Sequence, residues 1–190
     1  MPRSKFLNHL FFEILLSAAL YIAFFYFNLF VLAPFEVAQG VSWIFLPAGL
    51  RIFIALIFDY SGAVGLAVAS LIINFISFSE YDLISILGIA AICGVAPLLS
   101  RHFVIHNLRV HSDLSNISLS QLVAIIFVFS LLSSGLHQLW FEVRNLESGS
   151  FDHFLIMLFG DIVGSVLIIT LIKYGINVVK KKMGRDSLIE

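Results

Sequence analysis

The sequence has one cysteine, four prolines and few charged residues. Because Cys93 has no second cysteine to join, an intrachain disulfide and a cysteine metal cluster within one copy are excluded. Lys, Arg, Asp and Glu make up 12% of the 190 residues, which excludes an ordinary soluble domain and a disordered chain alike. No polar segment is long enough to bury a soluble core, so we expect no fused output or catalytic domain.

Hydrophobic residues dominate instead. They make up 60% of the chain, which includes 20 phenylalanines, and the mean hydropathy is +1.03. The apolar runs are continuous rather than alternating, which favours helices over a β-barrel. We therefore predict an all-α integral membrane protein in the lipid bilayer, a single bundle of about six transmembrane helices. The expected spans are 10–33, 43–58, 62–78, 83–99, 119–141 and 154–174, followed by a basic tail over 176–190.

The basic residues predict the orientation of this bundle. Arg144 alone falls on one side of a six-helix arrangement, where the connections are otherwise acidic. The other side carries Arg3, Lys5, Arg101, Arg109, Lys173, Lys180, Lys181, Lys182 and Arg185. Since Lys and Arg accumulate in cytoplasmic segments, we expect both termini to be cytoplasmic.

Arg51 is the residue that most needs a partner. It lies roughly 12 Å into the span that begins at Trp43, and a lone charge near the middle of a bilayer costs ~2.5–3.5 kcal/mol. Asp161 lies at nearly the same depth in the last span, so we expect a buried Arg51–Asp161 ion pair. Two interpretations stay open: the pair clamps two helices, or it forms a charged site for an anionic or zwitterionic ligand.

Three further residues could line a cavity next to this pair. Asn74 and His137 fall near the outer ends of their spans, and Trp43 falls at the membrane interface. For Trp43 the alternative is an ordinary interfacial aromatic belt. For His137 the alternative is a local hydrogen bond to a neighbour on its own helix.

Small and ring-constrained residues predict close packing at two places. Gly160 and Gly164 form a Gly-Asp-x-x-Gly pattern around Asp161, which is also a Gly-x-x-x-Gly face that permits close helix approach. Pro47 and Gly49 stand at the start of the short second span. That span could begin as a non-helical segment at Trp43, which is tolerated only where protein covers the backbone.

The sequence offers no constellation for catalysis. His102 and His106 have a spacing that could present two imidazoles to a metal, but Arg101 and Arg109 beside them disfavour a cation, so a solvated loop is expected there. Cys93 has no basic neighbour that would activate its thiol. We therefore expect no enzymatic activity, no metal, no cofactor and no nucleic-acid partner.

Two of these motifs resemble the first family of membrane-associated sensor (MASE) domains of bacteria. Trp43-Ile-Phe-Leu-Pro47-Ala-Gly49-Leu-Arg51 is similar to that family's Trp-Pro-x-x-Gly motif, and Phe159-Gly160-Asp161-Ile-Val-Gly164 is similar to its closing Gly-Asp-x-x-Gly pattern. The family often has adjacent prolines where Pro47 stands alone. Its members usually precede a diguanylate cyclase or histidine kinase domain, whereas this chain ends at Glu190.

The resemblance implies a stand-alone sensory or ligand-binding module in a bacterial inner membrane, without enzymatic activity, that signals through a cytoplasmic or membrane partner. A small molecule would bind beside Arg51 and Asp161, and the segment 101–119 and the basic tail would pass the change on. The first alternative is a substrate-capture subunit like those of energy-coupling-factor vitamin transporters, which have a similar length and an Ala-x-x-x-Ala docking face resembling Ala19 to Ala23. The second is a structural or assembly protein whose buried pair is only a clamp.

Overall fold

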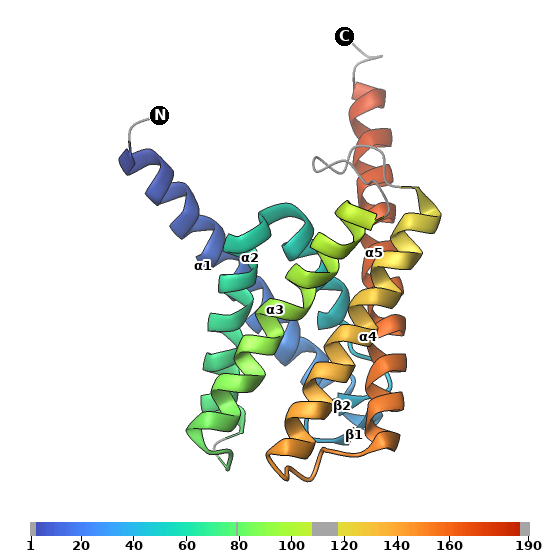
Figure 1. The fold of residues 1–190 in the computed structure, drawn as a ribbon. Coiled ribbons are helices and arrows are strands. Elements are labelled where there is room, and N and C mark those ends of the chain that lie inside the picture. Colours follow the sequence, from blue (N-terminus) through green and yellow to red (C-terminus); the bar gives the residue numbers. More distant parts are fainter. Residues whose placement is uncertain (1–2, 79, 108–117, 187–190) are drawn as a thin grey trace.

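The structure, a computed structural model, describes residues 3–78, 80–107 and 118–186, with side chains over 7–175 of these ranges. Five helices and one small sheet make up this part of the chain (Figure 1). Their bounds are α1 Arg3–Val31, the 3-10 turn η1 Ala33–Phe35, β1 Glu36–Ala38, β2 Val41–Ser42, α2 Pro47–Ser77, α3 Leu83–Asn107, α4 Leu119–Val143 and α5 Phe151–Asp186.

The described helices confirm the predicted class of helical membrane protein. Five of them contain segments long and apolar enough to cross a membrane, the longest being Pro47–Ser77. Large apolar side chains are exposed along all five, as expected of helices that face lipid. The first residues of α1 and the last of α5 lie at the same end of the bundle, which we call the terminal end; the opposite end, which holds β1 and β2, is the hairpin end (Figure 1).

The helix α2 contains both the second and the third expected spans. Its hydrogen bonding runs from Pro47 to Ser77, but Asp59 has φ 49° and ψ −122°, which is not helical. A Cβ atom on Gly62 would lie 2.8 Å from the carbonyl oxygen of Ile54, although eight residues of straight helix would separate them by about 12 Å. The chain therefore reverses at Asp59, and α2 consists of a first arm, 47–58, and a second arm, 60–77.

The expectation of a purely α-helical chain is wrong at one place. β1 and β2 form an antiparallel hairpin, and a connecting segment without regular secondary structure, 43–46, joins β2 to the first arm of α2. Its backbone donors are paired within the protein: Phe45 N donates to Gly160 O at 3.2 Å, and Leu46 N donates to Asn28 Oδ1 at 2.9 Å. Because these groups are satisfied inside the protein, non-helical backbone can lie beside the membrane helices.

Several predicted helix ends differ from those in the structure. The first helix begins at Arg3 rather than at residue 10, and α3 continues past Leu99 to Asn107 with Pro97 inside it. The residues His102 and His106 therefore lie on a helix and not in a loop. The last helix also extends through most of the expected basic tail, ending at Asp186, and residues 187–190 lie outside the described residues.

The second arm of α2 packs against α1 and α3, and the first arm also contacts α5. One buried cluster joins Tyr21 of α1 to Leu50 and Ile54 of the first arm and to Leu66 and Ile73 of the second. A second cluster joins Ala48 and Ile52 of the first arm to residues of α3 and α4. The first arm, which carries Arg51, is thus enclosed by protein on several sides.

Candidate ligand-binding site

Arg51 and Asp161, which the sequence predicts to pair, form an ion pair between the first arm of α2 and α5. Arg51 Nη2 lies 3.3 Å from Asp161 Oδ1 and 3.5 Å from Oδ2. The Arg51 side chain is 2% exposed and the Asp161 side chain 0%. Charge-assisted N–H···O bonds are usually about 2.7–2.9 Å long, so one nitrogen is shared over two oxygens in a loose contact.

The guanidinium group keeps unused hydrogen-bonding capacity. Arg51 Nε is buried and has no hydrogen-bond partner among the described residues. Phe45 and Phe129 flank the group, with ring centroids 5.3 Å and 5.1 Å from Arg51 Cζ. Cation–π contacts of this kind partly compensate the loss of hydration. Arg51 is therefore held in place by rings and by Asp161, while its Nε–H has no partner among the described residues.

A cavity of about 60 Å³ opens next to Arg51. Its walls come from α1, both arms of α2, α3, α4 and α5, and the turn between β1 and β2 covers it with Gln39 and Gly40. Phe78 and Tyr81, which lie at the hairpin end, also line it. The cavity thus occupies the half of the bundle that lies towards the hairpin end, and of the ion pair only Arg51 lines it.

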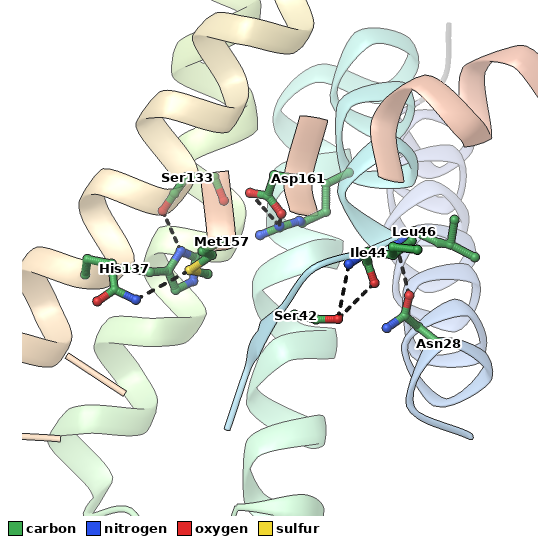
Figure 2. A network of polar contacts seen from close by, with 10 residues as sticks. Asn28, Ser42, Ile44, Leu46, Ser133, His137, Met157 and Asp161 are labelled. Atoms are coloured by element: carbon green, nitrogen blue, oxygen red, sulfur yellow. Dashed lines mark hydrogen bonds and ion pairs between the residues drawn. The ribbon is translucent and has the colours of Figure 1, made fainter. Parts of the chain in front are cut away.

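Asn74 and His137, predicted from the sequence as candidate ligand contacts, both line this cavity. Asn74 Nδ2 donates to the carbonyl oxygen of Ser70 at 2.7 Å. His137 Nδ1 lies 2.8 Å from the carbonyl oxygen of Ser133, the local hydrogen bond expected as its alternative role (Figure 2). These bonds leave Asn74 Oδ1 and His137 Nε2 without a hydrogen bond to the described residues.

The four small or ring-constrained residues lie where α5 meets the start of α2. A Cβ atom on Gly49 would lie 2.9 Å from Ser165 Cα, so the first arm and α5 approach backbone to backbone. Cβ atoms on Gly160 and Gly164 would overlap the carbonyl oxygens of Ser42 and Phe45. The Gly-x-x-x-Gly face therefore contacts the non-helical backbone of β2 and the connecting segment instead of the helix that the pattern suggested.

Pro47 is the first residue of α2, a position whose backbone N–H has no partner within a helix, so its absence in proline costs nothing there. Figure 2 shows how Ser42, Ile44 and Leu46 follow one another between Asp161 and Asn28 of α1. The Ser42 hydroxyl donates to the carbonyl oxygen of Ile44 at 3.0 Å, which stabilises this course of the chain. The start of α2 is therefore held by α1 on one side and by α5 on the other.

Trp43 does not belong to the cavity, so this part of the predicted site is wrong. Its side chain is 44% exposed, and its ring centroid lies 5.9 Å from that of Phe159 on the outside of α5. Phe45 lies against Arg51 while Trp43 lies on the outside, although residues two apart would share one face of a regular strand, so the segment 43–46 does not keep strand geometry. Trp43 thus occupies the position of an interfacial aromatic residue.

The sequence analysis missed Tyr21, Ser70 and the flanking rings Phe45 and Phe129. All four are buried or half-buried near Arg51, and Tyr21 and Ser70 line the cavity. In a chain this rich in phenylalanine, nothing in the spacing separates a ring against an arginine from a ring against lipid. The predicted spans 43–58 and 62–78 already place a reversal near Asp59, but their spacing does not tell which face of the second arm lies beside Arg51.

Two sets of polar contacts, one at each end of the bundle, connect the helices around the site. At the terminal end, Arg101 Nη1 of α3 lies 2.9 Å from Asp59 Oδ1 in the reversal of α2. The Ser61 hydroxyl donates to Glu13 Oε2 of α1 at 2.6 Å, and Tyr60 OH lies 3.3 Å from His102 Nε2. The turn between the two arms is therefore tied to both α1 and α3.

At the hairpin end, Arg144 joins the end of α4 to the start of α3. Its Nη2 lies 2.8 Å from Asp82 Oδ2, and its Nε lies 3.1 Å from the Ser85 hydroxyl. Trp140 Nε1 donates to the carbonyl oxygen of Ser85 at 3.1 Å. Hydrogen bonds from Ser85 and then from Arg144 hold the pKa of Asp82 below its ordinary value.

The described residues contain no group of three or more His, Cys, Asp or Glu side chains that could hold a metal ion. Both imidazole nitrogens of His102 are in hydrogen bonds, one with a backbone carbonyl and the other with Tyr60. Neither is therefore directed at a metal that His106 could share. What the fold and the site define is a helical membrane protein whose described residues include a buried ion pair, with Arg51 beside a small and mostly apolar cavity. In comparisons with family models, curated proteins and solved structures, nothing matches this chain.

Proposed function

We propose that this chain is a membrane module that binds a small ligand beside Arg51 and passes its bound state to a partner protein. The observation that supports the proposal is the unused capacity of Arg51. A charge this deep costs several kcal/mol to bury, and intramembrane ionisable residues of this kind usually mark binding sites or pathways. Here the guanidinium adjoins a cavity and keeps a donor without a partner.

We also propose that the two arms of α2 count as separate membrane segments, giving six in all. The second arm is long enough to cross, at about 27 Å, whereas the first arm needs the connecting segment 43–46 to complete its path. The terminal end would face the cytoplasm of a bacterium, because most basic residues fall in the segments that reach it. The hairpin end and the cavity would then face outward.

The reversal at Asp59 offers a route from the cavity to the terminal end. Arg51 lies eight residues, about 12 Å, from Asp59 along the first arm. Asp59 in turn pairs with Arg101, and the segment 101–119 that follows is the proposed contact for a partner. A ligand that shifts the first arm relative to α5 would therefore displace the Asp59–Arg101 pair.

A cavity-filling substitution tests the proposal. Purified protein would be screened by thermal unfolding against a broad panel of small polar metabolites, as wild type and as Ile89→Phe, which places a ring in the cavity wall. Leu87→Phe, on the lipid-facing side of α3, is the matched control. We expect a stabilising compound for wild type and for Leu87→Phe that has no effect on Ile89→Phe. A panel without any stabilising compound would refute the proposal.

One observation favours a transporter subunit as the second candidate. Ala19 and Ala23 are both exposed on the outer face of α1, where small side chains let another helix approach closely. Replacing both with leucine should abolish co-purification of a membrane subunit and ATPases, whereas the exposed Ala91→Leu on α3 should not. Co-purification of a kinase or cyclase would instead favour the sensor.

A further inference from the structure

We infer that the ligand of this cavity is a small zwitterionic amino acid, of the size of glycine or alanine. The inference depends on the proposed function, since it names the chemical class that the same cavity would take. It follows from three properties of the site: the balance of charge, the hydrogen-bonding groups that remain free, and the volume.

The balance of charge excludes a simple anion. Arg51 and Asp161 already neutralise one another inside the protein. A ligand with only a carboxylate would add an uncompensated negative charge at a buried position, which costs several kcal/mol. A ligand with only an ammonium would add an uncompensated positive charge. A zwitterion adds neither, because its two charges cancel while each still finds its own partner.

The free hydrogen-bonding groups match the two ends of a zwitterion. At one end of the cavity Arg51 has an Nε–H without a partner among the described residues, which is a donor left for a carboxylate. Asn74 has given its Nδ2 to Ser70, so its Oδ1 is an acceptor. His137 binds the carbonyl oxygen of Ser133 through Nδ1, so the neutral ring presents Nε2 as a second acceptor. Acceptors on two different helices are what an ammonium group requires.

The volume limits the side chain of such a ligand. A water's share of the liquid is ~30 Å³, so a cavity of about 60 Å³ has the volume of roughly two waters and leaves no room for a ligand with a long side chain. The remaining walls are apolar and large, including Phe25, Phe141 and Met157. A longer or charged side chain would have to displace one of these.

The experiment measures thermal unfolding and equilibrium binding of the full chain in lipid nanodiscs with six probes: glycine, L-alanine, L-leucine, L-aspartate, propionate and ethylamine. We expect glycine and L-alanine to stabilise the protein and the other four to have no effect at the same concentration. Asn74→Leu should weaken glycine binding about tenfold or more, since a buried charged ligand group loses its acceptor. Ile89→Phe should abolish it, and Leu87→Phe should leave it unchanged.

The outcomes separate the inference from the proposed function. Stabilisation by propionate equal to that by alanine would identify an anion site and overturn the inference, with the module still a ligand-binding one. The same holds if another class in the broad panel stabilises wild type but not Ile89→Phe. Glycine binding that persists in Ile89→Phe would place the ligand elsewhere and also overturn it. If no compound of either set binds, both the inference and the proposed function fail.

Discussion

The ion pair in the interior and the ion pair at the hairpin end differ in length and in exposure, and the shorter pair is not the more important one for the fold. Arg144 and Asp82 approach to 2.8 Å, with side chains 30% and 50% exposed, whereas Arg51 and Asp161 stay 3.3 Å apart with almost no exposure. The exposed pair has the shorter contact. It contributes less to stability, because water and salt can replace either partner at the surface.

The interior pair has no such replacement. If one partner is lost, the other remains a buried charge without a counter-charge, and the cost of that charge is much larger than the gain from a short contact. A further difference lies in what surrounds the cation: rings of Phe45 and Phe129 for Arg51, and hydroxyl and carboxylate groups for Arg144. The comparison shows that environment, and not contact length, decides which arginine the fold depends on.

The largest expected effect comes from breaking the interior pair on one side. Arg51→Met leaves Asp161 buried without a counter-charge and should destabilise the protein by about 3–5 kcal/mol. The double variant Arg51→Met with Asp161→Leu should recover most of that loss, because it leaves no unpaired charge. Thermal unfolding in detergent measures both. Exchanging the two charges, Arg51→Asp with Asp161→Arg, should also recover stability relative to its single variants; if it is as unstable as they are, the pair does not stabilise the fold.

A slightly smaller effect should follow from filling the space that Gly164 leaves for non-helical backbone. Gly164→Ala places a methyl group against the carbonyl oxygen of Phe45, and overpacking of this kind costs about 1–3 kcal/mol. It should also displace Phe45 from Arg51 and so weaken ligand binding. Gly175→Ala on the same helix meets nothing within 4 Å and is the matched control, expected to be neutral or slightly stabilising. Equal unfolding temperatures for the two variants would contradict this account of the packing.

The sequence predicted the interior pair because charge in a membrane is scarce. With one arginine and one aspartate at similar depth in different spans, few other partners were available, and continuous apolar runs made the helical membrane class plain. The β1–β2 hairpin and the partners of Gly160 and Gly164 could not be predicted in the same way. A Gly-x-x-x-Gly pattern indicates only that another segment of the chain approaches closely, and it does not distinguish a helix from non-helical backbone. Likewise the turn predicted between the spans 43–58 and 62–78 did not tell that the face of the second arm with Ser70 and Asn74 would lie beside Arg51.

The smallest effect is expected at the hairpin end, and it should depend on pH. Since the pKa of Asp82 is lowered in the folded protein, its ionised form is the one that the fold stabilises. That contribution is fully present above the ordinary value of 3.8 and is lost as the pH falls through the lower folded value. Arg144→Gln should therefore lower the unfolding temperature slightly at neutral pH, and its difference from wild type should shrink on acidification and in high salt. Lys173→Gln, at the other end of the molecule, serves as the control for a lost positive charge. A difference between Arg144→Gln and wild type that persisted unchanged at acid pH would show that Arg144 acts through Ser85 and the packing of Trp140, and not through the charge of Asp82.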